Sequence, residues 1–134
     1  MRALPLAMGL LLLALPARAD SYEEHDYILN CSGCHRMDGR GSRTVPSLLD
    51  MAELRGKPGA RKYWVQVPGA AQAPLTDARL AALLNWLVKR FTGQSPTPAY
   101  TDEEVRRLRR TPARDPLAER AKIRDAKVRL PRRE

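Results

Sequence analysis

The sequence is poor in the residues that small domains use to build a core or bind a metal. It contains one Phe, two Trp and four Tyr, and only two Cys and two His. A chain of this length is marginally stable with so little aromatic surface. It also has no Gly-rich phosphate loop, no internal repeat and no sustained strand pattern. These absences argue against a nucleotide-binding or β-sheet protein and predict an all-α fold.

Long apolar runs are also missing after the first 19 residues. The N-terminus has Arg2, then a Leu/Ala-rich stretch over residues 4–15, then Ala17-Arg18-Ala19. A span needs about 20 apolar residues, so this stretch is typical of a signal peptide with a small-x-small cleavage site. We expect residues 1–19 to be removed near Ala19, giving a periplasmic protein with no membrane span. An uncleaved anchor is the alternative.

The two cysteines lie in one motif, Cys31-Ser32-Gly33-Cys34-His35. The C-x-x-C-H spacing is the attachment signature of c-type haem, in which both thiols form thioether bonds and the imidazole ligates iron. Cysteines three apart on a short helical turn reach one porphyrin edge, and the next residue lies under the metal. The motif predicts one haem c (iron), bound covalently by Cys31 and Cys34, with His35 as proximal ligand.

Three other chemistries could use the same motif. A thioredoxin-like dithiol requires a βαβ setting, and no alternation of strands and helices is visible. A disulfide between Cys31 and Cys34 would close a loop too short to stabilise the fold much. Zinc requires about four ligands, and the other candidate, His25, is poorly spaced from Cys31 for a tetrahedral site.

The chain is basic, with a formal net charge of +9. Loss of Arg2 and Arg18 with the signal peptide leaves +7. Residues 20–91 contain ten basic and eight acidic side chains, whereas residues 92–134 contain twelve and seven. The positive excess is therefore mostly C-terminal. We expect no nucleic-acid partner, because the protein is exported.

Local patterns predict where the helices lie. Ser21, Thr76 and the Thr101 to Glu104 capping box indicate helix starts, and Gly93 indicates a stop. The helices are expected over residues 20–30, 47–55, 60–67, 77–91, 101–110 and from 115 onward.

Inward-facing residues follow from the same patterns. The helix before the motif is expected to turn Tyr27, and Leu29 or Ile28, inward. Pro68 is expected to end the helix over 60–67. Between the first two helices, the Pro46 carbonyl is expected to return to the His35 N–H and fix the ring.

These features together resemble the small single-haem class I cytochromes c. The matching parts are the helix Tyr22 to Asn30, the Cys31 to His35 motif, Pro46 and the helix Asp77 to Phe91. The resemblance implies a helical domain over residues 20–91 wrapped around one haem, with Tyr27 and Trp86 as its crossing aromatic pair. Residues 92–134 lie outside it and form a Pro-containing linker and basic helical tail.

The resemblance also implies a sixth iron ligand, usually a Met in the loop before the last helix of the domain. The corresponding loop, residues 68–75, contains no Met. Met51 is the candidate distal ligand, with core filling as its alternative role. Gln72 or an open position stays possible, whereas Met37 and His25 are poorly placed.

The resemblance implies a soluble periplasmic electron carrier rather than an enzyme, with peroxidase-like chemistry left open. It would pass single electrons from a dehydrogenase or respiratory complex to a terminal acceptor. A haem protein with an open sixth position that binds or senses a small gas is the alternative. Partners would be redox proteins, for example a quinoprotein dehydrogenase or an oxidase. An acidic patch on them would attract basic residues, namely Arg36, Arg40, Lys57, Arg61 and Lys62.

Overall fold

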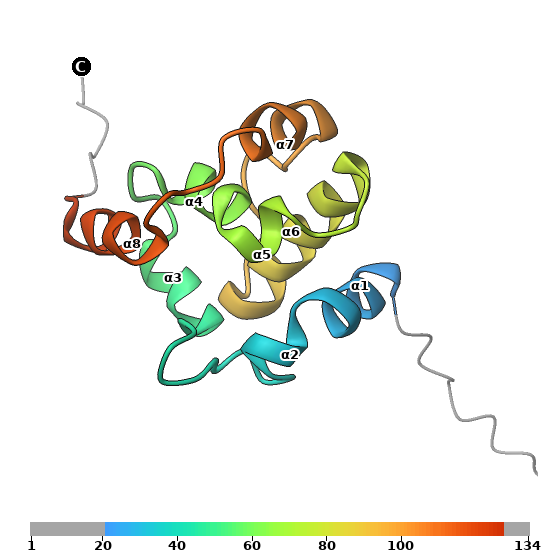
Figure 1. Ribbon diagram of the computed structural model, residues 1–134, viewed down its shortest axis with the longest axis horizontal. Coiled ribbons are helices and arrows are strands. Elements are labelled where there is room, and N and C mark those ends of the chain that lie inside the picture. Colours follow the sequence, from blue (N-terminus) through green and yellow to red (C-terminus); the bar gives the residue numbers. More distant parts are fainter. Residues whose placement is uncertain (1–20, 128–134) are drawn as a thin grey trace, which may run out of the picture.

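The computed structural model describes residues 21–127. Within these residues all assigned elements are helices and none is a strand (Figure 1). The all-α prediction is confirmed. None of these helices is long and apolar enough to cross a membrane. The expected signal peptide lies outside the described residues. The elements are α1 (Tyr22–Asn30), α2 (Ser32–His35), the 3-10 helix η1 (Leu48–Asp50), α3 (Met51–Leu54), α4 (Ala60–Gln66), α5 (Pro68–Ala71), α6 (Asp77–Thr92), α7 (Asp102–Arg109) and α8 (Pro116–Asp125).

Four α-helices begin with a capping side chain. Ser21, Thr76 and Thr101 each accept a hydrogen bond of 3.2 Å from the backbone N–H three residues later. Asp115 accepts an equivalent bond of 2.9 Å. Gly93 ends α6 in the left-handed conformation, with φ of 73°. Caps satisfy backbone groups that have no partner inside the helix, and their sequence signals are local. The expected starts and the stop are confirmed for this reason.

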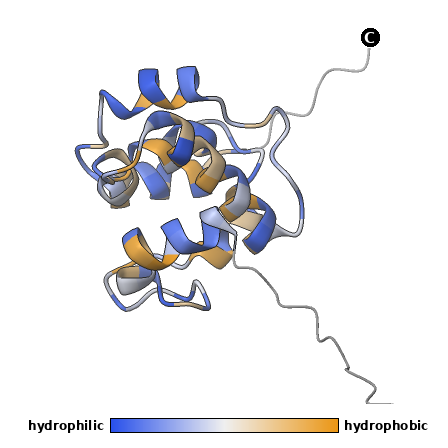
Figure 2. Cartoon of the chain, turned by 90° about the vertical axis from the view of Figure 1, so that its right-hand side faces the viewer, coloured by the Kyte–Doolittle hydropathy of each residue, from blue (hydrophilic) through white to orange (hydrophobic). Residues whose placement is uncertain are grey.

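Helix α6 is the central element, and it packs against α1, η1, α3 and α7. Where α1 meets α6, the Tyr27 and Trp86 ring centroids are 5.7 Å apart. The aromatic contact expected there is present. The core around α6 contains Met51, Val65, Leu80, Leu83, Leu84, Leu87, Val88, Tyr100 and Val105. Figure 2 shows hydrophilic and hydrophobic stretches alternating along the same helices, as amphipathic helices require.

The inward face of α1 differs from the expectation. Tyr27 is buried, but Ile28 is 40 % and Leu29 67 % exposed. Successive helical residues are rotated by about 100°, so the two residues after Tyr27 turn away from the core. The buried neighbour is instead Asp26, whose carboxylate accepts hydrogen bonds from Arg79 on α6. The prediction for Ile28 and Leu29 was wrong because a paired carboxylate takes the inward position.

Helix α4 ends at Gln66, just before Pro68, as expected, but Pro68 does not begin an irregular loop. It is the first residue of a further helical turn, α5, which runs to Ala71. Proline suits this position because the first N–H of a helix needs no partner inside the helix. The irregular loop before α6 is therefore shorter than expected and covers residues 72–76.

The described residues after Phe91, 92–127, pack on the residues before it. We call residues 92–127 the tail region and residues 21–91 the motif region. Helix α7 packs on α6 and α4, whereas α8 packs on α4 and α3, as Figure 1 shows. Tyr100 and Val105 join the main core, and Ile123 joins a second cluster with Leu54 and Tyr63. The tail region therefore contributes buried residues to both hydrophobic clusters.

The sequence pattern of α8 predicts Leu117, Ala121 and either Ile123 or Val128 on its packed side. Ile123 is buried, but Leu117 is 60 % exposed, so the prediction for Leu117 was wrong. Val128 lies outside the described residues.

Charged contacts fasten the tail region to the motif region. Arg61 of α4 donates to the Glu104 carboxylate of α7 at 2.6 Å and to the Pro98 and Ala99 carbonyls at 2.6 and 2.9 Å. Its guanidinium carbon also lies 4.0 Å from the centroid of the Tyr100 ring. One arginine therefore holds the linker and the start of α7 together.

Candidate functional site

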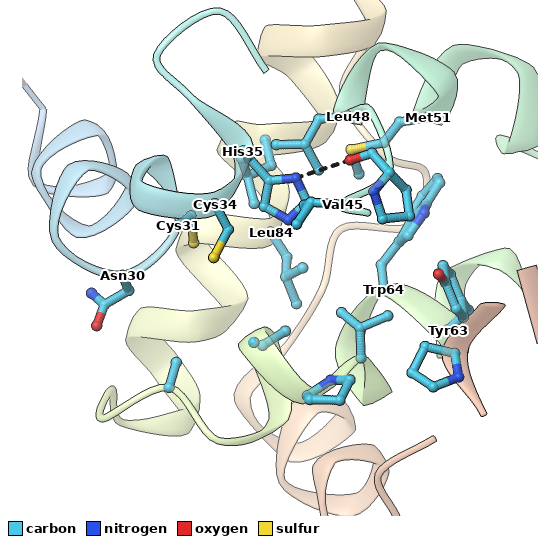
Figure 3. Close-up of a pocket in the computed structure, with 18 of the residues that line it drawn as sticks. Asn30, Cys31, Cys34, His35, Val45, Leu48, Met51, Tyr63, Trp64 and Leu84 are labelled. Carbon is cyan, nitrogen blue, oxygen red and sulfur yellow. Dashed lines mark hydrogen bonds between the residues drawn. The ribbon is translucent and has the colours of Figure 1, made fainter. Parts of the chain in front are cut away.

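The two cysteines lie where α1 passes into α2. The N–H groups of Cys31 and His35 donate to the Tyr27 and Cys31 carbonyls, both at 2.9 Å, which makes one continuous helical turn through the motif. Both thiols are free. Figure 3 shows the two sulfur atoms close together and pointing to the same side. The short turn thus presents Cys31, Cys34 and His35 together, as the spacing predicts.

A tight loop brings Pro46 back to His35. Gly41 has φ of 67°, and its N–H donates to the His35 carbonyl at 3.0 Å. A Cβ atom on Gly41 would lie 2.3 Å from the Val45 carbonyl oxygen, so only glycine fits there without a shift of the backbone. At the end of this loop, the His35 Nδ1–H donates to the Pro46 carbonyl oxygen at 3.1 Å. The expected hydrogen bond is present.

This hydrogen bond determines which ring nitrogen of His35 is available. With Nδ1 as donor, Nε2 carries a lone pair, and Figure 3 shows it facing the pocket. Burial lowers the pKa of His35, and the hydrogen bond to Pro46 opposes this shift in part. A neutral, oriented imidazole is the form that binds metals.

The environment of Cys31 favours the protonated thiol. Burial, with the nearby Asp26 and Cys34, raises the pKa of Cys31 to about 11. Reactive redox dithiols instead need a lowered pKa and an electropositive setting. This chemistry opposes a thioredoxin-like role for the pair.

A single pocket of about 430 Å³ adjoins the motif. All four predicted site residues, Cys31, Cys34, His35 and Met51, line it. Its volume is within the usual range of cofactor pockets. Most of the other walls are apolar, and they include Val45, Leu48, Trp64, Val67, Ala70, Ala73, Leu80, Leu83, Leu84 and Leu87.

Met51 contributes to the wall but is also part of the core. Its side chain is only 4 % exposed, and it starts α3 directly after η1. Figure 3 shows Met51 beside Leu48, on the side of the His35 ring that carries the hydrogen bond. The burial of Met51 in the main core is compatible with core filling, and its ligand role stays a prediction.

The other distal candidates lie outside the pocket. Gln72 and His25 are exposed, and so is Met37. None of the three is among the residues that line the pocket.

The wall formed by residues 67–75 is held by a residue that the sequence did not single out. Arg109, at the end of α7, donates to the Ala71, Ala73 and Leu75 carbonyls at 2.8 to 3.1 Å. It also donates to the Asp77 carboxylate at 3.1 Å. An arginine in a run of arginines is typical of a solvated helix face, so no local signal distinguished it.

Helix α8 also reaches the pocket, which the sequence did not indicate. Pro116, Leu117 and Arg120 line it. Arg120 forms an ion pair with Asp50 of η1 through Nη2. The resemblance placed the tail outside the haem domain, so these residues were not candidates.

The five expected docking cations divide into two groups. Arg61 is bound to Glu104, and Lys57 lies 3.6 Å from Glu53 and donates to the Arg124 carbonyl. The exposed members are Arg36, Arg40 and Lys62, and Arg40 Nε lies 3.3 Å from the Asp38 carboxylate. The attraction of a partner by the exposed group stays a prediction.

Within residues 21–127 there is no group of three or more His, Cys, Asp or Glu side chains suited to hold a metal ion. In comparisons with known proteins, no family model, no curated protein and no solved structure matches this chain.

Proposed function

We propose that the chain is a periplasmic monohaem c-type cytochrome that carries single electrons between a dehydrogenase or respiratory complex and a terminal acceptor. The observation that carries this proposal is the convergence of two free thiols and an oriented imidazole on one largely apolar pocket. The helix order from α1 to α6 further supports a class I cytochrome c fold around that pocket. Export rests on the sequence of residues 1–19.

The residues at the pocket fit a haem by their donor chemistry. Cys31 and Cys34 would hold it through thioether bonds, and His35 would bind its iron through Nε2 while Pro46 keeps the ring in place. Bound there, the iron would supply a reversible one-electron couple.

The rest of the chain provides the surroundings that electron transfer requires. Apolar side chains such as Leu80 and Leu84 keep water from the interior of the pocket. Arg109 holds the opposite wall by backbone hydrogen bonds, and Tyr27 donates through its hydroxyl to the Arg36 carbonyl beside the motif. Walls held in this way change little between redox states, which suits a carrier better than a catalyst.

Mass spectrometry of denatured protein, produced in a periplasm with competent haem maturation, tests the proposal. We expect a mass increased by one haem and an absorption spectrum that changes on reduction. Cys31→Ala with Cys34→Ala should abolish the added mass, whereas Ser32→Ala, which keeps both thiols and His35, should retain it. A wild-type chain without the added mass would refute the proposal.

A second candidate function is binding of a small gas at an open sixth position. The observation that favours it is the far wall, residues 67–73, which offers no Met or His among the described residues that line the pocket. Carbon monoxide added to the reduced protein separates the two functions. A low-spin spectrum that resists the gas supports the carrier, whereas a high-spin spectrum with rapid binding supports the open site.

Met51→Ala belongs in the same assay. A spectrum that changes to high-spin would identify its sulfur as the ligand, and an unchanged spectrum would exclude it. Met37→Ala is the matched control, because Met37 is exposed.

A further inference from the structure

We propose that α8 completes the cofactor site, with Arg120 binding a carboxylate of the haem. This inference rests on the proposed function and assigns to the tail region a direct role in holding the cofactor. Haem has an apolar ring and two propionate carboxylates, so its pocket needs both apolar walls and a place for negative charge.

The position of Arg120 carries the first step. It lies on α8, one turn after Pro116 and Leu117, and all three residues line the same pocket as His35. Its side chain is only 17 % exposed. Helix α8 is held against α3 and α4, and Ile123 is buried between them and α8. The packing of α8 around Ile123 and the ion pair with Asp50 therefore keep the guanidinium at the pocket.

Charge carries the second step. Among the described residues that line the pocket, Arg120 is the only Lys, Arg, Asp or Glu. An amphiphilic ligand in this otherwise apolar pocket binds most tightly when its acidic group contacts this one cation. The planar fork of arginine matches a carboxylate in a way that a lysine ammonium does not.

Within the described part of the chain, Arg120 has N–H donors beyond those of its ion pair with Asp50. Its pair with Asp50 uses Nη2, and a guanidinium carries five N–H donors, so Nε and Nη1 have donors for a second carboxylate. The ion pair with Asp50 orients Arg120 at the pocket and leaves its remaining N–H groups for a ligand carboxylate.

Tyr63 adds a neutral polar group at the same place. It is buried on α4 and lines the pocket. Burial raises the pKa of Tyr63, and the neighbouring Arg120 opposes this shift only in part, so the hydroxyl keeps its proton at neutral pH. The Tyr63 hydroxyl beside the Arg120 guanidinium offers a second hydrogen-bond donor to a carboxylate.

The test compares purified holoprotein carrying Arg120→Gln with holoprotein carrying Arg124→Gln. Both variants lose one positive charge from α8, but Arg124 is 58 % exposed, pairs with Asp125 and does not line the pocket. The readouts are the midpoint potential and the propionate vibrations in the resonance Raman spectrum, which respond to hydrogen bonding of the carboxylates. A purely structural role of Arg120 would not move the vibrations.

We expect Arg120→Gln to shift the propionate vibrations and make the midpoint potential more negative, because loss of a nearby cation leaves the carboxylate uncompensated and stabilises the more positively charged oxidised iron relative to the reduced iron. Arg124→Gln should leave both readouts at their wild-type values. Equal readouts for the two variants would overturn the inference.

Arg120→Lys keeps the inference testable if Arg120→Gln does not accumulate. This variant preserves the positive charge but loses the planar guanidinium. The propionate vibrations should therefore shift, while the midpoint potential stays close to that of the wild type. Unshifted vibrations in Arg120→Lys would overturn the proposed contact. The haem mass is measured first on each preparation: wild-type protein without haem refutes the proposed function, whereas haem-loaded protein insensitive to Arg120 refutes only this inference.

Discussion

The motif region and the tail region hold their contacts in different ways. In the motif region the site depends on partners close in the chain, such as His35 with Pro46 and Gly41. In the tail region the decisive contacts join residues far apart, such as Arg109 with Ala71 and Glu104 with Arg61. The motif region thus carries the thiols and the imidazole that line the pocket, while the tail region supports the walls around them.

Removing the tail region should have the largest effect. A chain ending at Phe91 loses the buried Tyr100, Val105 and Ile123 and the Arg109 contacts. We expect a loss of more than about 5 kcal/mol in the free energy of unfolding, which is comparable to the total stability of a small domain. Circular dichroism melting of the holoprotein measures it.

A chain ending at Lys127 is the control for this truncation and should melt like the full chain. If the chain ending at Phe91 kept its stability and its affinity for a partner, the tail region would be dispensable. The expected domain over residues 20–91 would then be shown to fold on its own.

Gly41→Ala should have the next largest effect, within the motif region. The new Cβ would meet the Val45 carbonyl in a backbone conformation that alanine disfavours. We expect a loss of about 3 to 4 kcal/mol, together with a weaker hold on His35. Denaturant unfolding followed by the haem absorption measures both effects.

Gly56→Ala is the matched control for the left-handed backbone. Gly56 has φ of 81°, but nothing lies within 4 Å of its added Cβ. It should lose only about 1 kcal/mol. Equal losses in the two variants would show that the clash with Val45 does not matter.

Arg109→Gln should have an intermediate effect and tests the hold of the tail region on the pocket wall. The variant leaves the Ala71, Ala73 and Leu75 carbonyls without their charged donor. We expect a loss of about 2 to 3 kcal/mol and faster binding of carbon monoxide to the reduced protein. Denaturant unfolding and flash photolysis measure the two quantities.

The control for Arg109→Gln is Arg107→Gln, which changes an exposed residue of the same helix. It should leave stability within about 0.5 kcal/mol of the wild type. Similar results for the two arginines would mean that the wall does not depend on Arg109.

Charge reversal at the exposed cations should have the smallest effect. Arg40→Glu combined with Lys62→Glu should slow oxidation of the reduced protein by ferricyanide, an anionic probe, by roughly a few-fold at low ionic strength. Stopped-flow absorption measures the rate. The difference should disappear near 1 M salt, and a difference that persisted there would exclude electrostatic steering.

Local signals explain why much of the motif region could be predicted. The caps at Ser21 and Thr76, the stop at Gly93 and the His35 to Pro46 bond each depend on residues within about a dozen positions of one another. The Tyr27 to Trp86 contact followed from the resemblance rather than from spacing. Ile28 and Leu29 were misplaced because hydrophobicity alone does not indicate that a paired Asp26 faces inward.

The walls of the pocket could not be predicted in the same way. Arg109 and Arg120 belong to an arginine-rich segment, and nothing in their neighbours distinguishes them from the solvated Arg107 and Arg110. Their partners, Ala71 and Asp50, lie 38 and 70 residues away in the chain. Only the folded chain brings such pairs together.

The sequence by itself determined the helices, the reactive triplet of Cys31, Cys34 and His35, and the orientation of the imidazole. These features depend on backbone hydrogen bonds and side chains a few residues apart, which short stretches specify. The tertiary structure alone decided what surrounds the triplet, including the wall held by Arg109 and the position of Arg120. Such contacts depend on how whole helices pack, and packing is a property of the complete chain.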